Sequence, residues 1–125
     1  MRYLVIDDSP TMRRIIINAL RTFGVDDIVE AGDGQEGIAK IYSQKVDFVI
    51  TDWNMPKMTG IEMTRIIRAD ESLKNLPILM VTTRELKQDI MEAHDAKVDN
   101  YIVKPFTPQI LKEKIDAVLK TVASR

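Results

Sequence analysis

The sequence contains no cysteine, which excludes disulfide bonds and metal sites built from thiolates. Its charges nearly cancel, to a formal net charge of −1, so we expect no nucleic acid and no anionic membrane as a partner. No apolar run approaches the roughly 18 residues of a membrane span. The N-terminus passes from Tyr3-Leu4-Val5-Ile6 directly into acids and does not have the form of a signal peptide. We therefore expect a cytoplasmic protein.

What is present suits one domain with one core. The 125 residues are 45% hydrophobic and 30% charged, as in ordinary globular proteins. Five short apolar runs recur along the chain, at Tyr3–Ile6, Ile28–Ala31, Phe48–Thr51, Ile78–Val81 and Tyr101–Val103. Most of these runs are continuous rather than alternating, which is typical of strands buried on both faces of a parallel sheet.

Segments with helical periodicity separate the five runs. The first segment has one apolar stripe, formed by Met12, Ile16, Ala19, Leu20 and Phe23, and the last has another, formed by Leu111, Ile115, Val118, Leu119 and Val122. Helix starts are predicted at Ser9-Pro10, at Thr107-Pro108, and at the capping-box spacings Asp33…Glu36 and Thr59…Glu62. Gly24 stands where the glycine that ends the first helix is expected.

This alternation predicts an α/β fold. Five βα units form a doubly wound, five-stranded parallel sheet, with helices on both faces and right-handed crossovers. The units occupy residues 1–125, so we expect a single domain and no output domain.

Reactive side chains follow four of the predicted strands. The first strand leads into Asp7-Asp8, the third into Asp52, the fourth into Thr82-Thr83 and the fifth into Lys104-Pro105. The carboxyl ends of parallel strands meet at one edge of the sheet, where sites form in open α/β folds. We therefore expect three carboxylates, a hydroxyl and an ammonium group to converge there.

These groups suit the binding of a phosphoryl group. Three neighbouring carboxylates raise one another's pKa unless a cation lies among them, and Mg²⁺, which prefers oxygen ligands, is suited to that position. Lys104 offers a mobile charge for a carboxylate or a phosphoryl oxygen, and Thr82 offers a hydroxyl donor. Asp52 is then a candidate nucleophile that becomes phosphorylated.

The chain resembles the bacterial response-regulator receiver domains, and among them the regulators of chemotaxis. The resemblance spans the full length and rests on Val5-Ile6-Asp7-Asp8-Ser9, Thr51-Asp52-Trp53-Asn54-Met55-Pro56 with Gly60, Val81-Thr82, and Asn100-Tyr101-Ile102-Val103-Lys104-Pro105-Phe106. It implies the flavodoxin-like strand order 2-1-3-4-5. It also implies that the Lys104–Pro105 peptide is cis.

The resemblance further implies residue roles and partners. A sensor histidine kinase, the chemotaxis kinase, phosphorylates Asp52, while Asp7, Asp8, Asp52 and the backbone carbonyl of Asn54 hold Mg²⁺. Lys104 pairs with the acyl phosphate, Thr82 moves to bond it, and Tyr101 swings inward. The fourth helix, fifth strand and fifth helix then bind a partner, the flagellar motor switch, through Ile90, Tyr101, Val103 and Lys114. A phosphatase is a further expected partner, and the protein is expected to be a monomer.

Several residues depart from the family pattern or invite a role of their own. Thr83 stands where a small residue is usual and is expected to alter access to the phosphate, and we expect Arg84 to alter autodephosphorylation. Lys97 replaces a usual glycine, which predicts a strained end of the fourth helix. His94, the only histidine, is expected at the surface. Trp53 is expected either to report ligand binding or simply to pack near the sheet edge.

Three other functions remain open. The chain can be a phosphorelay intermediate that passes its phosphoryl group to a histidine phosphotransfer protein. A Mg²⁺-dependent aspartyl phosphohydrolase has its nucleophile after the first strand and a second acid two residues later, which Asp7-Asp8-Ser9 does not match. A degenerate receiver that only binds partners is disfavoured by the complete set of acids. In the leading interpretation the protein is not an enzyme, and its only reactions are its own phosphorylation and autodephosphorylation.

Overall fold

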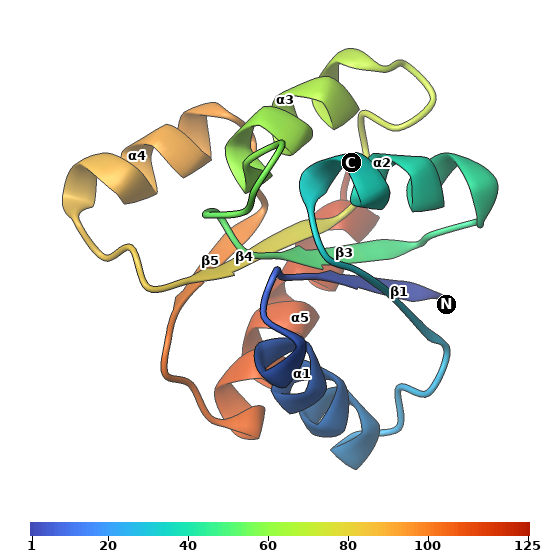
Figure 1. Ribbon diagram of the computed structural model, residues 1–125, viewed down its shortest axis with the longest axis vertical. Helices are drawn as coiled ribbons and strands as arrows, with labels where there is room; N and C mark the ends of the chain where they lie inside the picture. Colours follow the sequence, from blue (N-terminus) through green and yellow to red (C-terminus); the bar gives the residue numbers. More distant parts are fainter.

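The computed structural model describes residues 1–125 as a five-stranded parallel sheet covered by five helices (Figure 1). The strands are β1 (Tyr3–Ile6), β2 (Ile28–Ala31), β3 (Phe48–Thr51), β4 (Ile78–Thr82) and β5 (Asn100–Val103). Their order is β2-β1-β3-β4-β5 and every pair is parallel, which confirms the predicted fold and strand order. β4 extends one residue beyond its predicted end, to Thr82, and β5 begins one residue earlier than predicted, at Asn100.

The helices lie on both faces of the sheet, as predicted. They are α1 (Pro10–Thr22), α2 (Gly34–Ser43), α3 (Gly60–Ala69), α4 (Lys87–Asp95) and α5 (Pro108–Ala123). Figure 1 shows α1 and α5 together on one face, with α2, α3 and α4 on the other. None of the five is both long enough and apolar enough to cross a membrane.

Apolar side chains fill both spaces between sheet and helices. On the α1–α5 face the predicted stripes pack on the sheet, with Leu20 and Leu111 fully buried beside Phe48. On the other face, one cluster includes Ile6, Met63 and Ile67, and a smaller one surrounds Trp53. The central strands β1, β3 and β4 are therefore buried along their whole length, as the continuous apolar runs indicate.

The two edge strands differ from that expectation. β2 has one buried residue, Ala31, and β5 has one, Ile102, while their other residues are partly or fully exposed. An edge strand has a neighbour on one side only, so its outer flank lies open to solvent even when its sequence is apolar.

The predicted helix ends are confirmed. The hydroxyls of Ser9 and Thr107 each accept a hydrogen bond from a backbone N–H in the first turn, and Thr59 forms the complete capping box with Glu62. Gly24 follows α1 with φ +90°, a backbone conformation that side chains disfavour. α4 is the exception, because its N-cap residue, Leu86, provides no side-chain hydrogen bond.

The loop after α4 carries the predicted backbone strain at Lys97, where φ is 72°. The Arg68 guanidinium holds this loop in place. Its Nε donates to the Lys97 carbonyl at 3.0 Å, and its Nη2 lies 3.0 Å from the Asp99 carboxylate. Both partners of this ion pair are buried, with side chains 8% and 6% exposed. A buried, hydrogen-bonded pair of this kind keeps the left-handed residue in position despite its cost.

Replacing Lys97 with glycine should remove that cost. Lys97→Gly is expected to raise the free energy of unfolding in urea by about 1 kcal/mol, because glycine adopts positive φ freely. Lys97→Ala is the matched control. It removes the ammonium group but keeps a Cβ atom, and should stay within about 0.5 kcal/mol of wild type. A glycine variant no more stable than the alanine variant would show that the backbone there is not strained.

Candidate functional site

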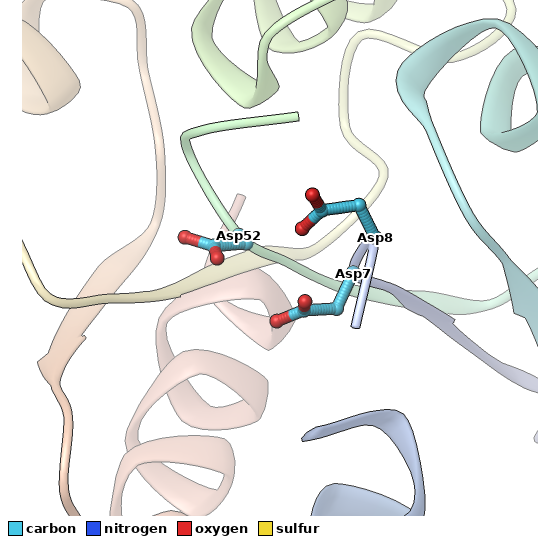
Figure 2. Close-up of side chains that lie close together, drawn as sticks. All are labelled: Asp7, Asp8 and Asp52. Atoms are coloured by element: carbon cyan, nitrogen blue, oxygen red, sulfur yellow. The ribbon is translucent and has the colours of Figure 1, made fainter. Parts of the chain in front are cut away.

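Three aspartates meet at the carboxyl edge of the sheet, where β1 and β3 end (Figure 2). The two strands pair with Ile6 opposite Thr51, so the residues that follow them emerge side by side. The Asp52 N–H donates to the Ile6 carbonyl at 3.0 Å and extends this pairing by one residue. One carboxylate oxygen from each of Asp7, Asp8 and Asp52 lies within 4.8 Å of the others. The convergence expected from the strand ends is therefore present.

The three acids differ in burial. Asp7 is 2% exposed, the Asp52 side chain is 12% exposed, and Asp8 faces solvent. The Asp8 carboxylate has no hydrogen-bond or ion-pair partner in the protein, whereas Asp7 Oδ1 accepts from the Ser9 N–H at 2.9 Å. The site thus contains one buried, one half-buried and one open carboxylate.

Lys104 joins two of these acids. Its Nζ lies 3.0 Å from Asp7 Oδ2 and 3.0 Å from Asp52 Oδ2, and its side chain is 9% exposed. The backbone N–H of Lys104 donates to the Thr82 carbonyl at 2.8 Å, which fixes where the lysine leaves the sheet. The Lys104–Pro105 peptide is cis, as the resemblance implies.

Burial and charge act on this group in opposite directions. Burial raises the pKa of the Asp7 carboxyl, and the bonds from Ser9 and Lys104 only partly offset it. Burial lowers the pKa of the Lys104 ammonium, but Asp52 and Asp7 together outweigh burial and hold the pKa above its usual value. The lysine is therefore charged throughout the physiological range and stabilises the ionised acids.

The backbone around Asp52 is fixed by its neighbours. Asp52 Oδ1 accepts from the Trp53 N–H at 2.6 Å, so both carboxylate oxygens have a donor. Gly60, at the start of α3, donates to the Trp53 carbonyl at 2.9 Å. A Cβ atom on Gly60 would stand 2.1 Å from the Asp52 carbonyl oxygen, so only glycine allows this approach. The close approach explains physically why Gly60 belongs to the motif.

The donor set fits a hard divalent cation. Carboxylates from Asp7, Asp8 and Asp52 provide hard oxygen ligands, and Mg²⁺ characteristically binds one or two carboxylates and retains waters. The backbone carbonyl of Asn54 accepts no hydrogen bond within the protein and remains available. Asp8, exposed and unpaired beside two further acids, is the group that gains most from a cation.

Thr82 and Tyr101 lie beside the acids on the β4 side. Thr82 is completely buried, and its hydroxyl oxygen accepts from the Arg84 N–H at 3.3 Å. The Tyr101 hydroxyl donates to the Arg84 carbonyl at 2.8 Å. Burial, followed by the charge of Asp89, raises the pKa of the Tyr101 hydroxyl to about 12. The two predicted switch residues therefore contact the same backbone segment.

The sequence predicts separate roles for Arg84 and Asn54 at the site but gives no sign that their side chains are in contact. The Arg84 guanidinium stacks over the Trp53 ring at 4.5 Å and donates to Asn54 Oδ1 at 3.0 and 3.2 Å. It also lies 3.3 Å from Asp89 Oδ1 on α4. No periodicity or motif signals these contacts, because they join a loop, a second loop and a helix.

Arg13 on α1 was also missed. Its Nη1 donates to the Asp7 carbonyl at 2.5 Å and its Nε to the Glu30 carboxylate at 3.0 Å. Arg13 therefore links α1 to the residue that follows β1 and to β2. The sequence indicates only that Arg13 lies off the apolar stripe of its helix.

The predicted partner-face residues divide between two hollows. Tyr101, Val103 and Lys114 line a groove of about 490 Å³ between β5 and the start of α5. Ile90 instead borders a smaller hollow of about 180 Å³ between α4 and β5, which it shares with Tyr101. Ile90 is 41% exposed and is not the core residue that helical periodicity alone allows. His94 lies at the surface, as predicted, with 88% of its side chain exposed.

Comparison with known proteins shows which family this chain belongs to. The response regulator receiver domain family matches residues 3–116. The chemotaxis protein CheY of Pseudomonas aeruginosa is 51% identical over 122 residues, which is 98% of each chain. The chemotaxis protein CheY-3 of Vibrio cholerae is 48% identical, over 96% of this chain and 92% of its own.

Solved structures agree with this pattern. The chemotaxis response regulator CheY4 of Vibrio cholerae matches with a TM-score of 0.86 at 33% identity, over 94% of this chain and 97% of its own. A putative response regulator of Chloroflexus aurantiacus matches with a TM-score of 0.89 at 28% identity, over 95% of this chain and 97% of its own. The fold and the strand-end acids therefore occur here in a chain similar to chemotaxis regulators along almost its whole length.

The unpaired position of Asp8 gives a direct test of metal binding. Saturating Mg²⁺, at about 100 times its dissociation constant, should stabilise wild type by about 2.7 kcal/mol, measured as urea unfolding followed by Trp53 fluorescence. Asp8→Asn should lose most of this gain, yet be at least as stable as wild type without metal, because it relieves repulsion among the acids. Asp26→Asn, another exposed aspartate without a partner, is the control and should respond like wild type. Equal stabilisation of Asp8→Asn and wild type would exclude Asp8 as a ligand.

Proposed function

The chain belongs to the response regulator receiver family, and we propose that it works as a stand-alone phosphorylation switch in which Asp52 accepts a phosphoryl group from a sensor histidine kinase. The observation that carries this proposal is the arrangement of Asp52 itself. Its carboxylate is half-buried at the sheet edge, bonded to Lys104 on one oxygen and to the Trp53 N–H on the other. The relatives are CheY proteins of chemotaxis, which is the process we propose for this chain.

The geometry favours Asp52 over its two neighbours as the nucleophile. Asp7 is enclosed and held by Ser9 and Lys104, whereas Asp8 has no positioned donor to orient it. In the transfer, an Asp52 oxygen attacks phosphorus, the bond from phosphorus to the kinase imidazole breaks, and the released imidazole nitrogen takes up a proton. Lys104 lies at the Asp52 oxygen and can compensate the charge that collects on the phosphoryl oxygens.

A bound Mg²⁺ would supply further compensation of negative charge between carboxylates and phosphoryl oxygens. Asp7, Asp8, Asp52 and the Asn54 carbonyl would hold it. The three carboxylates lie close enough to one another to bind the same cation. Without a metal, the Lys104 ammonium is the cation paired with Asp7 and Asp52.

The phosphoryl group carries about −1.5 to −2 charges and three acceptor oxygens. It replaces the single negative charge of the Asp52 carboxylate, so the net charge of the site falls by about 0.5 to 1. Lys104 already donates to Asp52, and in this proposal the Thr82 hydroxyl turns to the added oxygens as a second donor. Because Thr82 accepts the Arg84 N–H and Tyr101 bonds the Arg84 carbonyl, a shift of Thr82 reaches Tyr101 through one residue. A change of population from 1:99 to 99:1 needs about 5.5 kcal/mol, which several charge-assisted hydrogen bonds and a bound partner can supply together.

The responding face is α4, β5 and α5, with Ile90, Tyr101, Val103 and Lys114 as contact residues. Its partner in this proposal is the flagellar motor switch, and the donor is the chemotaxis kinase. A phosphatase would shorten the signal. The apolar groove along β5 and the exposed Ile90 support a protein partner on this face. In this proposal residues 1–125 act as one receiver domain and as a monomer. The expected effects of Thr83 on access to the phosphate and of Arg84 on autodephosphorylation stay predictions.

Two alternatives are weaker. An aspartyl phosphohydrolase would use the acid that ends β1, but that residue, Asp7, is 2% exposed and bonded to Lys104. A phosphorelay intermediate would have the same site, so its distinction is kinetic. Incubation of the phosphorylated protein with a histidine phosphotransfer domain separates a relay from a stand-alone switch, because only a relay must pass its phosphoryl group on rapidly.

Mass spectrometry tests the proposed function. Acetyl phosphate with Mg²⁺ should add the mass of one phosphoryl group to the intact protein, since the aspartyl site needs only a reactive donor and a metal. Asp52→Asn should show no such addition. Asp26→Asn, whose carboxylate lies outside the site, should be modified like wild type. The proposal fails if wild type gains no phosphoryl group, or if Asp52→Asn gains one as readily.

A further inference from the structure

α4 is the helix with the weakest attachment to the rest of the protein. It has one buried residue, Ala93, and no side-chain hydrogen bond at its N-cap. Ile90 and Met91 of α4 are exposed, and so is Leu86 at its N-cap. Packing therefore contributes little to holding the first turn of α4, and polar contacts there carry more of the attachment.

One polar contact ties that first turn to the acid site. Asp89 belongs to the first turn of α4, and its side chain is 13% exposed. Its Oδ1 lies 3.3 Å from Arg84 Nη1, and no other cation pairs with it. The same guanidinium donates two hydrogen bonds to Asn54 Oδ1, two residues after Asp52, and stacks on Trp53. Arg84 thus makes the polar connection between the loop after β3 and the first turn of α4, while Trp53 of the same loop packs against Ala93 further along the helix.

The partners of Arg84 hold it less firmly than a phosphoryl group would. The Asn54 amide oxygen is neutral, and the Asp89 contact uses one carboxylate oxygen. A phosphoryl group offers three acceptor oxygens with about −1.5 to −2 charges, which match the planar fork of a guanidinium. The Arg84 guanidinium already lies against the loop that carries Asp52, because it stacks on Trp53, whose N–H donates to Asp52 Oδ1.

We propose that Arg84 is a tether that holds the first turn of α4 through Asp89 in the unphosphorylated protein and leaves Asp89 for the phosphoryl oxygens on Asp52. This inference rests on the proposed phosphorylation of Asp52. It adds a route to α4 that runs through a side chain. The Thr82 and Tyr101 contacts, by contrast, involve the backbone of the same residue. Loss of the tether frees Ile90 and Met91 to rearrange on the proposed partner face.

Amide hydrogen exchange of α4 tests the tether, with the phosphorylated fraction of each sample measured by mass spectrometry. In wild type treated with acetyl phosphate and Mg²⁺, amides of Ile90–Ala93 should exchange about two- to five-fold faster, the range expected for loss of one partly exposed ion pair. Asp89→Asn and Arg84→Gln should show this faster exchange before phosphorylation and little further change after it.

Asp95→Asn is the matched control, because Asp95 is a carboxylate at the other end of α4 with 78% of its side chain exposed. It should behave like wild type in both states. The tether is contradicted if phosphorylated wild type exchanges at the unphosphorylated rate, or if unphosphorylated Asp89→Asn exchanges no faster than wild type. A wild type that gains no phosphoryl mass overturns the proposed function, and the inference with it. Phosphorylation without faster exchange overturns the tether alone.

Discussion

The two bonds of Lys104 to Asp7 and Asp52 are the interaction on which the functional edge of this protein depends. Three carboxylates within 4.8 Å of one another repel, and burial of Asp7 adds to the cost of its charge. A buried ammonium 3.0 Å from two of them offsets that cost, and removal of one partner from such a group typically costs about 3–5 kcal/mol. The lysine also links β5 at one edge of the sheet to β1 and β3 in its centre.

The surroundings of this group explain how a local change in charge reaches the surface. Gly60 brings α3 against the Asp52 carbonyl, and Trp53 packs with Ile61 of α3 and Ala93 of α4. The opposite side of the sheet, under α1 and α5, is filled by a larger and fully apolar cluster. In the proposed function, charge added at Asp52 would act between this closely packed cluster and α4, which has only one buried residue.

Much of this architecture could be predicted from residues close in sequence. Strand limits were right to within one residue, because continuous apolar runs mark buried strands and Ser9, Thr59 and Thr107 mark helix starts. The convergence of the acids could be predicted because the carboxyl ends of parallel strands all lie at one edge of the sheet. What could not be predicted depends on side-chain directions across the fold. The stacking of Arg84 on Trp53 and the Arg68–Asp99 pair under Lys97 join segments whose spacing follows no period.

The central claim is that Asp52, rather than Asp7 or Asp8, is the carboxylate that carries the phosphoryl group. Borohydride reduction of the phosphorylated protein converts an aspartyl phosphate into homoserine, and tandem mass spectrometry of tryptic peptides locates it. The account predicts homoserine at position 52, in the peptide that follows Lys45 and ends at Lys57, and unmodified Asp7 and Asp8. Homoserine at position 7 or 8, or at Asp47 in the same peptide, would contradict it.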